Sequence, residues 1–380
     1  MKIIIVTYPI GSGSGLSPIQ DFIKIFTNIY GKSDNISIVS GGEIINLDAH
    51  NIEICYVNPK SNFIKKHINM FACILKNALR YNKSIFFFTL GAELFFPSLM
   101  ALRLLRKKIV LLLTGDTLKI SKISLDRKYP IKLISLILSA IFADSIIVYS
   151  PSFLNTAFLK SFLFKKKIVF AYHHIIDLDS FKCEERYEDN EIIIGFVGRL
   201  VPEKNVTNLV LAIKILVEKY NINTKLIIIG DGPLRKYIEK LIDVLNLHNN
   251  IKILGWIPRQ ALPMYYRKFK ILVLPSFTEG LPYTILEAMA CGTPILATSV
   301  GAIPDIIRED ITGFLLDSFN AEDIARKIAE ILTIKEERLK EVGMAARTYI
   351  ARKFTIQRVI CTWKRILAEL NHFVHSLQGA

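Results

Sequence analysis

Short apolar runs rich in Ile, Val and Leu alternate with longer amphipathic segments along the whole chain. Strands that are apolar on both faces and separated by helix-length segments are typical of parallel sheets covered by helices on both sides. The pattern therefore predicts an α/β protein with two doubly wound parallel sheets. The predicted strands are 3–7, 52–57, 85–88, 109–113 and 146–149 in a first series, and 192–197, 226–229, 251–253, 271–274 and 295–297 in a second.

A polar, acidic stretch separates the two series of strands. Residues 182–191 read KCEERYEDNE, a composition typical of an interdomain linker. The chain, at 380 residues, also exceeds the size at which one hydrophobic core stops growing. We therefore expect a first Rossmann-like domain over residues 1–181 and a second over 190–350. The amphipathic segment 355–374 predicts a last helix that packs back on the first domain.

Basic residues are concentrated in the first half of the chain. Residues 1–183 hold 23 Lys and Arg against 11 Asp and Glu, which accounts for most of the net charge of +15. Clusters such as Arg106–Lys107–Lys108 and Lys165–Lys166–Lys167 lie near apolar stretches. Such a face suits an anionic membrane surface, with nucleic acid as the rival partner. A solvated basic face without a partner accounts for the charge equally well.

Neither the apolar segments nor the cysteines indicate a membrane span or a secreted scaffold. The best candidate span, 133–143, has 11 apolar or small residues, whereas a bilayer needs about 20. The N-terminus shows no signal-peptide cleavage pattern. The cysteines are scattered, odd in number and without a CxxC pair, which argues against disulfides and zinc and favours a reducing compartment. They are Cys55, Cys73, Cys183, Cys291 and Cys361.

The segment 275–307, PSFTEGLPYTILEAMACGTPILATSVGAIPDII, holds the first candidate chemistry. A helix is predicted from about Pro282 to Ala290, with Gly292 past its end, because Pro favours the first turn of a helix and Gly the position after the last. The start of this helix, next to Gly280, would offer backbone N–H groups and a positive dipole end to an anion.

Two glutamates, Glu279 and Glu287, bracket that anion site. Facing sugar or ribose hydroxyls would give them hydrogen-bond donors. Their spacing alone fits a solvent-facing loop residue and an ordinary helix residue equally well, so further residues are needed to decide.

Two basic residues follow the first strand of the second series. The segment GRLVPEKN, residues 198–205, places Arg199 and Lys204 at the carboxyl end of that strand, where ligands bind in parallel sheets. A guanidinium and an ammonium there can neutralise a diphosphate and stabilise the charge on a departing nucleoside diphosphate. Alternatively, each is a surface ion pair, for instance Lys204 with Glu203.

These motifs, in this order, resemble the large family of retaining glycosyltransferases that includes sucrose synthases, bacterial phosphatidylinositol mannosyltransferases and lipopolysaccharide glucosyltransferases. The resemblance covers residues 190–330, through GFVGRLVPEKN, LIIIGDGPLRKYIEKL, the stretch from IKILGW to AIPDII, and TGFLLD. It implies the GT-B fold, with two Rossmann-like domains facing each other across a cleft. It also implies sugar transfer from a UDP- or GDP-sugar to a glycan or lipid-linked acceptor, in cell-surface polysaccharide, glycolipid or glycoprotein-glycan synthesis.

The same resemblance implies roles for individual residues. Arg199 and Lys204 would grip the diphosphate, and Glu279 would orient the donor sugar without acting as a nucleophile. The other donor-site residues would be Gly280 and Leu281 with their N–H groups on phosphate, Glu287 on the ribose, Trp256 and Ile257 near the base, and Gly13 and Gly15 on the diphosphate. We expect no metal or other cofactor, no nucleic-acid partner, and a cytoplasmic location peripheral to the membrane.

The first half departs from the family pattern. Relatives carry a sugar-facing His after the strand that matches 109–113, whereas here Thr114 or Asp116 occupies that neighbourhood. The Asn-Gly-hydrophobic-Asp run that is usual before the linker is replaced here by residues 174–177, His-Ile-Ile-Asp, with Phe181 kept, and we interpret His173 and His174 as hinge residues. Asp177–Leu178–Asp179 resembles the DxD metal motif of the other glycosyltransferase fold, a match that we ascribe to chance.

Three alternative functions differ in class. The Gly-rich loop 11–15 suggests a dinucleotide-binding oxidoreductase, but its spacing is GxGxG and no acidic residue clearly ends a second strand about 20 residues on. A nucleotide-sugar 2-epimerase of the same fold would convert the donor without an acceptor. A catalytically silent subunit that anchors a partner enzyme at a membrane is disfavoured by the intact set of charged donor-site residues.

Overall fold

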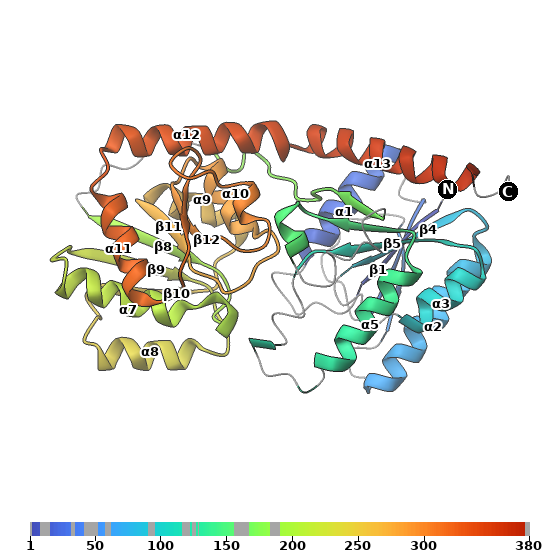
Figure 1. Ribbon diagram of the computed structural model, residues 1–380, viewed down its shortest axis with the longest axis horizontal. Coiled ribbons are helices and arrows are strands. Elements are labelled where there is room, and N and C mark those ends of the chain that lie inside the picture. Colours follow the sequence, from blue (N-terminus) through green and yellow to red (C-terminus); the bar gives the residue numbers. More distant parts are fainter. Residues whose placement is uncertain are drawn as a thin grey trace. The chain divides into compact units, whose positions relative to one another are not determined.

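The computed structural model forms two compact units (Figure 1), which we call unit 1, Met1–Ile175 with Ile356–Ala380, and unit 2, Ile176–Thr355. Unit 1 therefore ends before residue 181, the end expected for the first domain. The structure describes residues 2–7, 16–31, 35–41, 52–57, 62–89, 96–115, 122–123, 127, 129–155, 167–182 and 191–376.

Unit 1 is built on a parallel sheet of seven strands in the order β3-β2-β1-β4-β5-β6-β7, counted over the described residues. The first strand lies inside the sheet, and the chain winds outward from it in both directions, as in dinucleotide-binding folds. The strands are β1 Lys2–Thr7, β2 Ile36–Ser40, β3 Glu53–Tyr56, β4 Ser84–Thr89, β5 Lys108–Leu113, β6 Ser145–Val148 and β7 Ile168–Phe170.

Helices cover both faces of this sheet because its strands are apolar on both sides. The helices are α1 Leu16–Tyr30, α2 Phe63–Arg80, α3 Phe96–Leu104, α5 Tyr129–Phe142 and α13 Ile356–Ser376, with the 3₁₀ turn η3 Ser152–Asn155. One core joins alternate strand residues to α2, α3 and α5, and the other joins the remaining strand residues to α1 and α13. Trp363 of α13 is fully buried in this second core, so the last helix of the chain completes unit 1.

Unit 2 repeats the arrangement with six parallel strands in the order β10-β9-β8-β11-β12-β13. The strands are β8 Ile192–Val197, β9 Thr224–Ile229, β10 Ile251–Gly255, β11 Ile271–Leu274, β12 Ile295–Thr298 and β13 Phe314–Leu316. The helices are α7 Val206–Glu218, α8 Arg235–Val244, α9 Leu262–Lys268, α10 Tyr283–Ala290, α11 Ala321–Leu332 and α12 Glu336–Lys353, with 3₁₀ turns η4 Pro202–Lys204, η5 Arg259–Ala261 and η6 Ile303–Asp305. Figure 1 shows α7, α8 and α11 on one face and α9, α10 and α12 on the other.

All ten predicted strands lie in the two sheets, which confirms the doubly wound α/β architecture. The three strands that the apolar pattern missed are β2, β7 and β13. In β2, Ser37 and Ser40 interrupt the apolar run, while β7 and β13 are three-residue strands at the sheet edges, too short to give a periodic signal.

The cysteine prediction is wrong at one pair, because Cys55 and Cys73 form a disulfide. They are 18 residues apart in the sequence, but β3 and α2 bring their Cα atoms to 6.5 Å. Cys291 and Cys361 are free thiols, and Cys183 lies outside the described residues. Within the part of the chain that the structure describes, no helix is both long and apolar enough to cross a membrane.

Candidate functional site

The carboxyl ends of β8 and β11 meet because these strands are neighbours in the sheet of unit 2. The loop after β8 and the loop after β11 are joined by hydrogen bonds. The Phe277 N–H donates to the carbonyl of Glu203 at 2.8 Å, and Asn205 Nδ2 donates to the carbonyl of Pro275 at 3.1 Å. Asn205 can turn the chain into α7 because it adopts a left-handed conformation, with φ of 55°. The two loops thus form one rigid platform.

A glycine brings the loop after β12 onto the same platform. Gly301 has a φ of +60°, and a Cβ there would lie 2.2 Å from the carbonyl oxygen of Glu279. The next residue, Ala302, donates its N–H to the carbonyl of Gly280 at 2.9 Å. The backbone of Glu279 and Gly280 is therefore fixed from two sides.

Lys204 and Glu279 form an ion pair across the joined loops. The Lys204 Nζ lies 2.5 Å from Glu279 Oε1, and their side chains are only 15% and 7% exposed. Lys204 thus pairs with Glu279 rather than with Glu203, and Glu203 accepts from Arg199 at 3.3 Å. Arg199 is 58% exposed, so its guanidinium is accessible from solvent beside the buried pair.

The predicted helix after Glu279 is present as α10, which begins after Pro282 and is followed by Gly292 at a φ of 73°. Gly280 and Leu281 lead into its first turn. The helix N-terminus contributes partial positive charge and the nearby Arg199 a full one, so the platform suits an anion. The buried carboxylate of Glu279 lies at the same place and can accept hydrogen bonds from hydroxyl groups.

Glu287, on α10, is held by two partners that the sequence reasoning missed. Arg259 Nε lies 2.6 Å from one carboxylate oxygen, and the Tyr266 hydroxyl donates to the other at 2.9 Å. Burial and the Glu287 carboxylate raise the pKa of Tyr266 well above its usual value, so its hydroxyl stays protonated and donates. Glu287 stands within the apolar run TILEAMA, which predicts that its carboxylate is buried. A buried carboxylate needs hydrogen-bond donors, so this run is the signal in the sequence that two partners such as Arg259 and Tyr266 exist.

The loop after β10 carries the residues predicted near a base. Trp256 is 66% exposed and Ile257 is half-buried. The same loop leads directly into η5, which contains Arg259, so the loop and the Glu287 side chain belong to one connected region of unit 2.

The predicted sites in unit 1 have different outcomes. Gly13, Gly15 and Asp116 lie outside the described residues. Thr114 follows β5 and its hydroxyl is hydrogen-bonded to Tyr149, a residue whose pKa is raised well above the usual value by burial. That bond makes Thr114 part of a hydroxyl pair at the carboxyl end of the sheet.

His173 and His174, near the end of the first segment of unit 1, are buried and pack against other rings. His173 and His174 are both buried and stack on each other with ring centroids 4.4 Å apart. The ring of Phe22 stacks on His173 at the same distance. Asp177 also has a structural contact, because its carboxylate accepts from the Asp179 N–H at 3.0 Å and from the Ser180 hydroxyl at 2.6 Å. Within the described ranges no three His, Cys, Asp or Glu residues gather in a group that could hold a metal ion.

Part of the basic excess of unit 1 is structural. Lys107 donates to the carbonyls of Tyr81 and Asn82 at 2.8 and 3.0 Å, and burial lowers its pKa. Lys167 donates to the carbonyl of Ile141 at 2.7 Å, near the end of α5. These two lysines of the predicted clusters thus also have a structural role, because their ammonium groups donate to backbone carbonyls.

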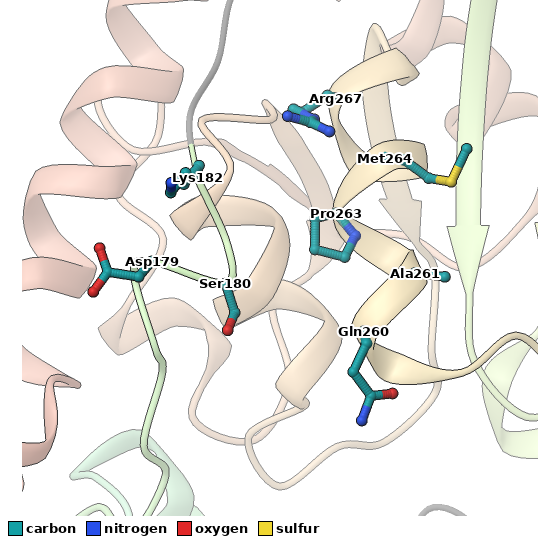
Figure 2. A pocket seen from close by; sticks show the side chains of 8 residues that line it. All are labelled: Asp179, Ser180, Lys182, Gln260, Ala261, Pro263, Met264 and Arg267. Atoms are coloured by element: carbon teal, nitrogen blue, oxygen red, sulfur yellow. The ribbon is translucent and has the colours of Figure 1, made fainter.

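A cavity of about 280 Å³ lies elsewhere in unit 2 (Figure 2). Three residues of the segment 179–182 line it on one side, and residues of η5 and α9 line it on the other. Its lining residues are Asp179, Ser180, Lys182, Gln260, Ala261, Pro263, Met264 and Arg267. It contains none of the residues predicted for the site.

Comparison with known proteins places the similarity mainly in unit 2. Residues 179–348 match the family model described as Glycosyl transferases group 1. The chain is 34% identical over 146 residues to the uncharacterized glycosyltransferase MJ1607 of Methanocaldococcus jannaschii, covering 38% of this chain and 37% of that protein. It is 30% identical over 207 residues to the capsular polysaccharide biosynthesis glycosyltransferase CapM of Staphylococcus aureus, covering 53% and 52%. The chain thus spans about half, or less, of the length of these curated relatives.

Solved structures match over nearly the whole chain. Anabaena Alr3699/HepE in complex with UDP-glucose has a TM-score of 0.77 and 18% sequence identity, covering 97% of this chain and 100% of that one. At this identity the likeness concerns the fold. It confirms the GT-B fold that the sequence resemblance implied.

Proposed function

We propose that the chain is a retaining glycosyltransferase, because its residues 179–348 match the family model described as Glycosyl transferases group 1. The reaction transfers a sugar from a UDP- or GDP-sugar to a hydroxyl of a glycan or lipid-linked acceptor, in cell-surface polysaccharide, glycolipid or glycoprotein-glycan synthesis. The observation that carries the proposal is the buried pair of Lys204 and Glu279, joined at 2.5 Å beside the start of α10.

The charges of this platform fit the leaving group of such a reaction. Breaking the bond between the anomeric carbon and the diphosphate places negative charge on the diphosphate. Lys204, Arg199 and the N-terminus of α10 supply positive charge that stabilises this developing charge. The N–H groups of Gly280 and Leu281 face the phosphate, while Glu279 accepts hydrogen bonds from the sugar hydroxyls.

The remaining roles follow from the same placement. Glu287 binds the ribose hydroxyls, and the loop with Ile257 lies against the base. The acceptor attacks from the side that the diphosphate leaves, so the anomeric configuration is retained and the leaving oxygen takes the acceptor's proton. No metal or other cofactor takes part, because the side chains and the helix supply the positive charge.

The first experiment measures nucleotide binding. UDP, GDP and ADP are added to the purified chain and the melting temperature is recorded; UDP comes first because HepE was solved with UDP-glucose. We expect one nucleoside diphosphate to stabilise the protein. Lys204→Met should weaken binding of that nucleotide by about tenfold or more, the size of a charge-assisted contact of about 1.5–3 kcal/mol. Lys214→Met on α7, whose partner Glu218 lies 3.7 Å away, is the control. Unchanged affinity in Lys204→Met would remove Lys204 from the site.

The second experiment defines the reaction. Nucleotide sugars of the preferred base are incubated with glycan and lipid-linked acceptors, with and without EDTA, and the product is examined by NMR. Retained anomeric configuration and activity in EDTA support the proposal, whereas an inverted product contradicts it. Sugar isomerisation without an acceptor identifies a 2-epimerase instead. A silent anchoring subunit is indicated if Glu279→Ala leaves cellular glycan unchanged while truncation does not.

The surface of unit 1 supports peripheral binding to an anionic membrane at the cytoplasmic face. On α3 and α5 several large apolar side chains are exposed, including Leu104 at 79% and Ile131 at 70%. These helices pack together, and the half of the chain that contains them carries the basic excess. Apolar side chains within a cationic surface bind anionic lipid headgroups. Ile131→Asp should reduce flotation with phosphatidylglycerol vesicles, with Ile311→Asp in unit 2, 53% exposed, as the control. Absence of flotation by the unaltered protein at low salt removes this part of the proposal.

A further inference from the structure

The two oxygens of the Glu287 carboxylate each accept one hydrogen bond, one from Arg259 and the other from Tyr266. The Glu287 side chain is 3% exposed, and the two donors approach from η5 and α9 at 2.6 and 2.9 Å. Each carboxylate oxygen has two acceptor positions, so both oxygens can accept another hydrogen bond. The two partners therefore fix the orientation of the carboxylate and still leave an acceptor position on each oxygen for a ligand.

The Arg259 guanidinium also lies over two aromatic rings. Its central carbon is 5.1 Å from the ring centroid of Tyr283, the first residue of α10, and 5.6 Å from that of Phe181. A guanidinium can use its edge for a carboxylate and its face for aromatic rings at the same time. Arg259 thus contacts Glu287, the start of α10 and Phe181 at once.

Phe181 belongs to what we call the entry segment, residues 176–182, the first residues of unit 2. Its side chain is 4% exposed, and its ring also lies 6.5 Å from that of Tyr266. Its carbonyl accepts from Arg347 at 2.7 Å, and Arg347 also donates to the carbonyl of Ala290 at the end of α10. The entry segment is therefore linked to both ends of the helix that carries Glu287.

The neighbouring part of the entry segment is not closely packed. Figure 2 shows the cavity between Asp179, Ser180 and Lys182 on one side and the residues of η5 and α9 on the other. Phe181 is not among its lining residues. Its ring instead lies against Arg259 and Tyr266, so this side chain connects the entry segment with η5 and α9.

We propose that Arg259 is a positioning residue that orients Glu287 for the nucleotide and couples this orientation to the entry segment through Phe181. The inference rests on the proposed function, in which Glu287 binds the ribose. Loss of the Phe181 ring removes one of the two rings that hold the guanidinium, so the carboxylate is held less firmly by one of its two donors. Nucleotide affinity consequently depends on a residue of the entry segment that does not touch the nucleotide.

A double-mutant cycle tests the positioning role. UDP and GDP affinities are measured by calorimetry for the unaltered chain, Arg259→Gln, Glu287→Gln and the double variant. Each single variant should bind about tenfold more weakly, and the double variant no more weakly than either, because the two residues act as one unit. Additive losses would show that Arg259 acts independently of Glu287 and would overturn the proposal, as would full affinity in Arg259→Gln.

Two milder variants keep the test valid if Arg259→Gln does not fold. Arg259→Lys keeps the charge but lacks the planar fork, so it should restore only part of the affinity. Phe181→Leu keeps an apolar side chain without a ring, and should weaken binding about threefold in the unaltered chain but not in Glu287→Gln. Unchanged binding in Phe181→Leu would overturn the coupling.

The matched control is Arg326→Gln on α11, which breaks exposed pairs with Asp323 and Glu330 and should leave affinity unchanged. If the unaltered chain binds neither UDP nor GDP, the proposed function fails and this inference fails with it. If the unaltered chain binds one of them and the Arg259 variants bind it equally well, the inference alone fails.

Discussion

The two glutamates of unit 2 are buried carboxylates with different partners. Glu279 is neutralised by Lys204, whereas Glu287 accepts from Arg259 and from the neutral phenol of Tyr266. An unpaired buried carboxylate costs several kcal/mol, so each position requires its donors in order to stay charged. This difference matches the proposed roles. Glu279 has a single ammonium partner and can rearrange around a sugar, whereas Glu287 has two donors that hold it in one orientation for the ribose.

The buried imidazole of His173 leads to a prediction about pH. Burial, with a smaller effect from His174, holds the pKa of His173 well below its usual value. The unfolded chain therefore binds more protons than the folded chain below about pH 6.5, and the stability that is fully present above this pH falls as the pH decreases. His173→Phe should lessen this acid loss, which approaches about 1.4 kcal/mol per pH unit for one group.

Urea unfolding at several pH values between neutral and mildly acidic measures this effect. His248→Gln serves as the control because His248 is 64% exposed. Equal pH slopes for His173→Phe and the unaltered chain would mean that His173 does not control the acid loss.

At the scale of elements, the platform around Lys204 and Glu279 is made by the segments that follow strands, whereas Glu287 lies on the helix α10. The order of the sheet makes β8, β11 and β12 consecutive, so the loops that follow them meet at one edge. Hydrogen bonds between the loops then fix the side chains, as the bond from Phe277 to the carbonyl of Glu203 illustrates. Small backbone shifts in one loop should therefore reach the whole platform.

Gly301→Ala tests this dependence between the loops. The residue has a φ of +60°, and the added Cβ would lie 2.2 Å from the Glu279 carbonyl oxygen, so the loop after β12 must move. We expect a loss of about 1–3 kcal/mol of stability and a clear loss of nucleotide affinity, measured by chemical unfolding and calorimetry. Gly115→Ala in unit 1 is the control, since among the described residues nothing lies within 4 Å of a Cβ added there. Normal affinity in Gly301→Ala would show that the loops are not coupled.

At the scale of the molecule, the chain leaves unit 1 after Ile175 and returns to it at Ile356. Unit 1 therefore depends on the last helix of the chain. Trp363 packs against Phe22, Phe26 and Phe87 at centroid distances of 5.4, 5.7 and 6.1 Å, and its Nε1 donates to the carbonyl of Tyr172 at 2.8 Å.

Trp363→Ala should destabilise unit 1 selectively. Replacing a fully buried Trp by Ala costs about 3–5 kcal/mol, through lost burial and the cavity that remains. Calorimetry should show the transition of unit 1 at a lower temperature and that of unit 2 unchanged. Trp256→Ala, at an exposed position of unit 2, should leave both transitions in place. An equal shift of both transitions in Trp363→Ala would contradict this assignment of α13.

The predictions from the sequence were most successful where the signal was periodic and least successful where it depended on partners. The ten apolar strands and the helix after Glu279 were predicted because burial on both faces and the Pro and Gly at the helix ends leave a local pattern. The disulfide of Cys55 and Cys73 and the contacts of Glu287 were missed, because each joins segments whose proximity depends on strand order.

The sequence by itself determined the class of fold, the two series of strands and the residues that resemble a donor site. These features depend on local composition and on the spacing of residues along the chain, so they can be recognised without the tertiary structure. Only the tertiary structure decided that Glu203 pairs with Arg199, that Lys204 pairs with Glu279, and that Arg259 connects Glu287 with Phe181. The physical reason is that hydrogen bonds and ion pairs act over a few ångströms, and the packing of the whole unit selects which side chains come within that range.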